Sequence, residues 1–132
     1  MINEAYVSFE VAKLLKEKGF DEPCFSFYQW YESGVTLFKG YLPEYSNSCS
    51  RHNNKSCDII SRPMQAMAMA WLREEKNIDI FPWLYYKDFE GKLTYSVSIY
   101  DHGCEITIPG FYDEKYENII EEALRYTLEN LI

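Results

Sequence analysis

The stretch that decides the fold reads PMQAMAMAWLREEK, from Pro63 to Lys76. Its apolar side chains recur at helical spacing, and alanine and methionine carry the apolar surface round most of the circumference. Most of these residues are strong helix formers, and proline is tolerated in a first turn because no N–H is needed there. The pattern therefore predicts a helix over this stretch, buried on more than one side. We expect Ser61 or Arg62 to cap the helix and Asn77 to end it.

Two further helices are predicted near the ends of the chain. The first runs from Phe9 to Lys18, because Ser8 can accept a hydrogen bond from the first turn and Gly19 permits a left-handed end. The second begins at Asp113 and runs to the C-terminus. Its apolar stripe has helical spacing throughout. The stripe consists of Tyr116, Ile119, Ile120, Ala123, Leu124, Thr127, Leu128 and Leu131.

Two hairpins are predicted from runs of β-branched and aromatic residues. Residues 25–31 and 35–41 form the first, and residues 80–87 and 92–100 the second. Turn-forming residues separate the two runs of each pair. A short strand is predicted at 105–108. Because proline cannot donate to a ladder, a proline within 80–87 predicts an edge strand or a bulge.

The order of elements is α-β-β-α-β-β-(β)-α, which predicts an α+β fold. We expect a mostly antiparallel sheet, built from the two hairpins and packed by three helices. One domain is expected over residues 1–132, since a chain of this length can bury a core without staples. Residues 43–60 are rich in serine and asparagine, and predict a long polar surface loop.

Composition restricts the classes of function. The chain is 47% hydrophobic and 17% aromatic, which excludes a disordered protein. Its net charge of −8 argues against general binding to nucleic acid, because no basic excess faces the phosphates. No apolar run is long enough for a membrane span, and Met1 is followed by no secretion signal. We therefore expect a cytoplasmic protein with reduced cysteines.

One pattern raises the possibility of a zinc cofactor. Cys49, His52 and Cys57 lie close together in the polar stretch, and Cys104 can supply a fourth ligand. Thiolates and imidazoles are the usual ligands of Zn²⁺, but this spacing is irregular. The alternative is a polar loop that carries incidental thiols.

No catalytic residues are predicted. A nucleophilic site can be drawn from Cys104, His102 and Asp101, or from Cys57 with His52. However, neighbours in sequence rarely point at one another, and catalytic partners usually meet from distant segments. The chain also lacks a phosphate loop, a dinucleotide fingerprint and the common hydrolase motifs. We therefore expect a protein that binds rather than catalyses.

The aromatic residues of the two hairpins exceed what one sheet face needs for a core. The candidate binding residues are Tyr28, Trp30, Trp83, Tyr85 and Tyr100. If exposed, they predict a surface for a protein partner or for self-association. The alternative ligand is a small molecule in a pocket lined by Trp30, Trp83 and Tyr85. The remaining interpretation is structural, with the rings filling both sides of a sheet or a dimer interface.

Three blocks of the chain resemble a known family. They are YVSFEVAKLLKEKGF at 6–20, RPMQAMAMAWLRE at 62–74 with IDI at 78–80, and residues 116–132. Together they are similar to uncharacterised small proteins of phages and integrated mobile elements in Bacteroides-type gut bacteria. The resemblance implies a bacterial cytoplasm and an accessory binding role, and no catalytic residues. Met64 departs from the family, which has threonine at that position.

Overall fold

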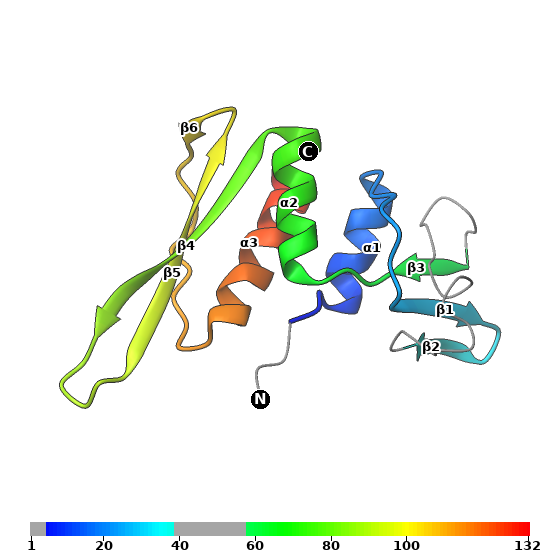
Figure 1. The fold of residues 1–132 in the computed structure, drawn as a ribbon, viewed down its shortest axis with the longest axis horizontal. Coiled ribbons are helices and arrows are strands. Elements are labelled where there is room, and N and C mark those ends of the chain that lie inside the picture. Colours follow the sequence, from blue (N-terminus) through cyan, green and yellow to red (C-terminus); the bar gives the residue numbers. More distant parts are fainter. Residues whose placement is uncertain (1–4, 39–57) are drawn as a thin grey trace. The chain divides into compact units, whose positions relative to one another are not determined.

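The computed structural model describes residues 5–38 and 58–132, and Figure 1 shows its helices and strands. The chain divides into two compact units, Met1–Met64 and Gln65–Ile132. Each unit contains a three-stranded sheet in which all neighbouring strands are antiparallel. With its helices this confirms the predicted α+β class. The single domain remains a prediction.

The first unit begins with α1, Phe9–Glu17, and both ends of this helix are as predicted. Ser8 Oγ accepts a hydrogen bond from the Val11 N–H at 3.2 Å. At the other end Gly19 has a φ of 95°, and the Phe20 N–H donates to the Leu15 carbonyl at 2.9 Å. This is the Schellman arrangement, in which glycine supplies the left-handed backbone.

The sheet of the first unit has the order β2-β1-β3. The predicted hairpin is confirmed as β1, Phe27–Tyr31, and β2, Gly34–Phe38. The third strand, β3, covers Ile59–Ser61 and pairs with β1. It corrects the predicted loop at 43–60, whose last two residues belong to a strand. The part of that loop up to residue 57 lies outside the described residues.

The second unit begins with α2, Gln65–Lys76. The helix starts later than predicted, because the residues before it are held in extended pairing. The Val7 N–H donates to the Pro63 carbonyl at 3.0 Å, and Met64 pairs with Tyr6 in an antiparallel bridge. Neither Ser61 nor Arg62 can therefore cap α2. Its end is as predicted, since Asn77 is left-handed with a φ of 54°.

The sheet of the second unit has the order β4-β5-β6. A long antiparallel pair is formed by β4, Ile78–Lys87, and β5, Leu93–Asp101. The predicted 105–108 strand is the shorter β6, Cys104–Glu105. Pro82 lies on the edge strand, and the pairing shifts between Leu84 and Tyr86, so both the predicted edge and a bulge are present.

Helices α2 and α3 lie side by side against one face of this sheet (Figure 1). The last helix, α3, covers Tyr116–Asn130. It begins after Asp113, because that residue is paired through its backbone with Tyr95 of β5. The apolar stripe of α3 is buried except at its ends, where Tyr116 is exposed and Leu131 is half-buried.

The core of the second unit lies between the helices and the sheet. The buried residues of this core are Ala68, Trp71, Leu72, Ile78, Ile80, Val97, Ile99, Ile119, Ile120, Ala123, Leu124 and Leu128. At its edge, Gln65 Nε2 donates to the Glu117 carbonyl at 2.9 Å and so links the first turns of α2 and α3. Among the described residues, no helix is long and apolar enough to cross a membrane.

We predict that Asn77 tolerates glycine and resists a β-branched residue. Asn77→Gly should leave the free energy of unfolding unchanged or slightly higher, because glycine adopts a positive φ without a steric penalty. Asn77→Val should lower it by about 1–2 kcal/mol, since a branched Cβ clashes in left-handed backbone, which asparagine tolerates. Urea unfolding of the three proteins gives the values. Equal stability of the valine variant would show that this turn is not a constraint.

Candidate functional site

The predicted binding residues fall into two groups, one in each unit. Tyr28 and Trp30 lie on β1, where both rings contact Phe9 of α1, with centroid distances of 4.8 and 5.8 Å. Tyr28 and Trp30 therefore pack the helix onto the first sheet, although Trp30 remains partly exposed. Trp83, Tyr85 and Tyr100 belong to the second unit.

The second sheet carries two groups of contacting rings on the face opposite α2 and α3. Strand register places Phe81, Trp83 and Tyr100 on this side, while Val97 and Ile99 point into the core. Successive ring centroids are 4.6–5.8 Å apart in two groups. We call the set the aromatic face. It consists of Phe81, Trp83, Tyr85, Tyr100 and Tyr112.

The rings of the aromatic face are exposed, except that of Tyr100, which is half-buried, and all of them are held in place. Tyr85 is 53% exposed, yet its ring contacts Trp83 at 5.8 Å and Tyr112 at 4.6 Å. Trp83 is 42% exposed, and its indole N–H donates to Ser98 Oγ at 3.0 Å. The second group is the edge-to-face pair of Phe81 and Tyr100. Such rings present large apolar area with little loss of side-chain freedom on binding.

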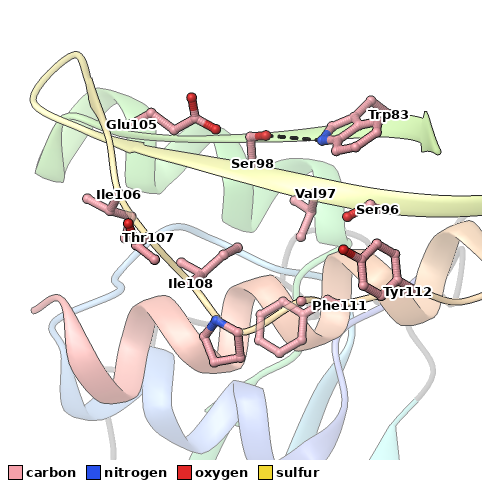
Figure 2. Close-up of a pocket in the computed structure, with 12 residues that line it drawn as sticks. Trp83, Ser96, Val97, Ser98, Glu105, Ile106, Thr107, Ile108, Phe111 and Tyr112 are labelled. Carbon is pink, nitrogen blue, oxygen red and sulfur yellow. Dashed lines mark hydrogen bonds between the residues drawn. The ribbon is translucent and has the colours of Figure 1, made fainter.

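A cleft of about 400 Å³ opens beside the aromatic face. Its walls come from the middle of β5, from Trp83 of β4 and from the segment that joins β6 to α3 (Figure 2). The lining residues are Trp83, Ser96, Val97, Ser98, Glu105, Ile106, Thr107, Ile108, Pro109, Gly110, Phe111 and Tyr112. Figure 2 shows the hydroxyl groups of Ser96 and Tyr112 directed toward one another.

The position of Tyr112 depends on two neighbours. A Cβ at Gly110 would lie 2.7 Å from Tyr112 Cε2, so glycine lets the ring fold back over the chain. The next residue, Asp113, exchanges backbone hydrogen bonds with Tyr95 at 2.8 and 3.1 Å. The Asp113 carboxylate accepts from the Lys115 N–H at 2.7 Å, which lowers its pKa. These contacts fix the chain directly after Tyr112.

Sequence reasoning did not identify Tyr112 or Glu105 as site residues. Glu105 lies on the two-residue strand β6 and Tyr112 in the segment between β6 and α3, and neither stretch has enough regular structure to identify a site from a periodic pattern. The one available signal was the Pro109-Gly110 pair directly before two aromatic residues. The small-molecule pocket expected from Trp30, Trp83 and Tyr85 does not correspond to this cleft. Of these three residues, only Trp83 lines the cleft.

The predicted zinc ligands cannot be assembled from the described residues. Cys49, His52 and Cys57 lie outside the described part of the chain. Cys104 is exposed on β6. Within residues 5–38 and 58–132, no group of three or more His, Cys, Asp or Glu side chains is arranged to hold a metal ion.

The residues considered for a nucleophilic site, Asp101, His102 and Cys104, lie on a surface hairpin. His102 and Gly103 have φ values of 52° and 81°, as in the tight turns that join antiparallel strands. His102 Nδ1 lies 2.6 Å from Asp101 Oδ1 of the preceding residue. None of Asp101, His102 and Cys104 lines the cleft. This turn chemistry explains the histidine and glycine without a catalytic role.

The other described cysteine is structural. Cys24 is buried in the first unit, and its thiol donates to the Glu22 carbonyl at 3.5 Å. Burial raises the pKa of this thiol to about 11. The thiol therefore stays protonated at neutral pH, which makes it a poor nucleophile.

No protein-family model, curated protein or solved structure matches the chain. The geometry and chemistry of the aromatic face and the cleft are therefore the basis for assigning a function.

We predict losses of stability of very different size when either of two tryptophans of the second unit is replaced by alanine. Trp83→Ala should lower the free energy of unfolding by about 1 kcal/mol or less, because the ring is exposed and loses one surface hydrogen bond. Trp71→Ala should lower it by about 3–5 kcal/mol, because that ring is only 7% exposed. Denaturant unfolding measures both. An equally large loss for Trp83→Ala would place this ring in the core.

We also predict that the two described cysteines differ in reactivity. Iodoacetamide at pH 8 should modify Cys104 in the native protein and leave Cys24 unmodified, because Cys24 is buried with a raised pKa. The unfolding free energy should also fall as the pH rises from 9 to 11, since only the unfolded chain ionises Cys24 in that range. Peptide mass mapping gives the sites. Rapid native modification of Cys24 would contradict its burial.

Proposed function

We propose that this protein is a non-enzymatic interaction protein and that the aromatic face binds a protein partner. The observation that carries the proposal is the exposure of linked rings on the sheet face that the helices leave uncovered. Contiguous apolar surface of this kind is typical of protein interaction sites. Tyrosine and tryptophan are also the residues that most often dominate binding energy at interfaces.

The charges around the aromatic face favour a basic protein over nucleic acid. Register places both Asp79 and Glu105 beside the rings, because each of them pairs with Tyr100, one from either side. A surface that stacks single-stranded bases normally combines rings with lysine or arginine. Lys92, on the hairpin turn between β4 and β5, is engaged with Glu114 at 2.9 Å. The net charge of −8 has the same sign as these carboxylates.

The partner should dock on the face rather than extend the sheet at β4. Phe81 and Trp83 direct their backbone groups toward β5, so the backbone of Pro82 faces the outer edge. Proline offers no N–H there, and the bulge between Leu84 and Tyr86 interrupts the edge again. An added strand would therefore lose hydrogen bonds at two places along the edge.

The setting of this activity is part of the proposal. The sequence resemblance points to an accessory protein of a phage or mobile element, acting in a bacterial cytoplasm. A small-molecule ligand is the second candidate, and the cleft beside Trp83 is the observation that favours it.

Site-specific photo-crosslinking tests the proposal. A benzophenone amino acid replaces Tyr85 in one variant and Tyr31 of β1, which is also exposed, in a matched control. Both variants are expressed in the bacterium that encodes the protein. Irradiation should give a discrete product for the Tyr85 position and none for the Tyr31 position. A product with the mass of two chains means self-association, and a different mass means another protein.

Identical products at both positions, or none at either, would overturn the proposal. In the second case a small-molecule ligand becomes the leading hypothesis, and native mass spectrometry of the protein purified from its host would detect it.

A further inference from the structure

The edge of β5 that faces away from β4 has a gap in its pairing. At one end Tyr95 exchanges hydrogen bonds with Asp113, and at the other the Ile106 N–H donates to the Ile99 carbonyl at 3.0 Å. Between these two contacts, residues 96–98 of β5 face the longer segment 107–112. The cleft occupies this gap.

The backbone of Val97 supplies a donor and an acceptor to the gap. Tyr95 and Ile99 direct their backbone groups to this edge, and residues two apart in a strand point the same way. On the other side Val97 lies opposite Pro82, which has no N–H to donate. Tyr95 and Ile99 form backbone hydrogen bonds along this edge, on either side of Val97. Within the described part of the chain, no backbone hydrogen bond along this edge involves Val97.

An unpaired N–H and C=O on one strand residue match one residue of an extended peptide. In an antiparallel ladder, two such residues exchange both hydrogen bonds. Val97 is only 5% exposed, so these two groups gain more from a partner than they would at an open surface. The gap therefore has room and backbone chemistry for a short strand-like segment.

The side chains around the gap suit a basic residue in that segment. Glu105 contributes a carboxylate, and the rings of Trp83 and Tyr112 contribute negative π-faces (Figure 2). Among the described residues that line the cleft, none is a lysine or an arginine. The Trp83 indole N–H is already bound to Ser98 Oγ, which fixes the orientation of the ring. A guanidinium group can stack on such rings and also bind a carboxylate.

We infer that the cleft binds an extended peptide segment of the partner, which pairs one residue with the Val97 backbone and places the arginine or lysine side chain of the next residue beside Trp83 and Glu105, on the face opposite the Val97 side chain. This inference rests on the proposed function, because it names the chemistry by which the aromatic face recognises a partner. It adds backbone pairing and a basic side chain to the contact that the rings make.

The probe is N-acetyl-alanyl-arginine N-methylamide, whose alanine can pair with Val97 while its arginine directs the guanidinium group to the opposite face, toward Trp83 and Glu105. Two-dimensional NMR of the ¹⁵N-labelled protein should show saturable shifts of the Val97 amide and the Trp83 indole, with affinity on the order of millimolar. The same dipeptide with norleucine in place of arginine should bind more weakly, and the dipeptide with glutamate should not bind. Methylation of the alanine amide nitrogen should weaken binding of the arginine probe about two- to tenfold, because it removes the donor to the Val97 carbonyl.

A charge-matched pair of variants separates the cleft from general electrostatics. Glu105→Gln should weaken binding of the arginine probe about two- to fivefold. Glu129→Gln, at an exposed position of α3, makes the same change in net charge and should have no effect. The NMR spectrum of each variant also reports whether it is folded.

Shifts of equal size with the glutamate probe, shifts that avoid Val97 and Trp83, or no saturable binding would overturn the inference. A crosslinked partner at Tyr85 together with any of these results would leave the proposed function standing and remove only the cleft from it. If no partner is crosslinked at Tyr85 and no probe binds in the cleft, both the proposed function and the further inference are wrong.

Discussion

The pairing of β4 with β5 is the constraint on which the second unit depends. Its register puts Ile80 opposite Ile99 and Trp83 opposite Ser96. The isoleucines lie on the side that α2 and α3 cover, and the tryptophan lies on the other. Because side chains alternate along a strand, a slip of one residue would exchange the two faces. The hydrophobic core and the aromatic face are therefore held by the same ladder of hydrogen bonds.

The cleft follows from how the chain leaves this ladder. After β6 it runs beside β5, loses contact near Val97 and rejoins the strand where Asp113 pairs with Tyr95. The rejoining delays the start of α3 and places Tyr112 against Tyr85. A binding gap and the last ring of the aromatic face thus have one cause, namely the return of the chain to the strand edge before the helix begins.

The features that were predicted correctly are those decided by neighbouring residues. Gly19 and Asn77 end helices as expected, because a positive φ is a local requirement. The two hairpins were also predictable from local alternation and turn residues. In contrast, the short strand β3 and the late start of α2 result from pairing with distant parts of the chain, which no local pattern reports. Tyr112 was missed for the same reason, since its contact with Tyr85 and its place in the cleft wall follow from the distant pairing of Asp113 with Tyr95.

Pro82 has a consequence beyond the choice of docking surface. Strands rich in exposed aromatic residues can stack with copies of themselves into cross-β fibrils, where nearly every backbone N–H must find an acceptor in the next chain. The outer edge of β4 cannot meet that requirement at Pro82, which has no backbone N–H. Pro82 lies in the middle of the strand that carries Phe81 and Trp83. The protein can therefore expose these rings to solvent while its own backbone opposes amyloid growth.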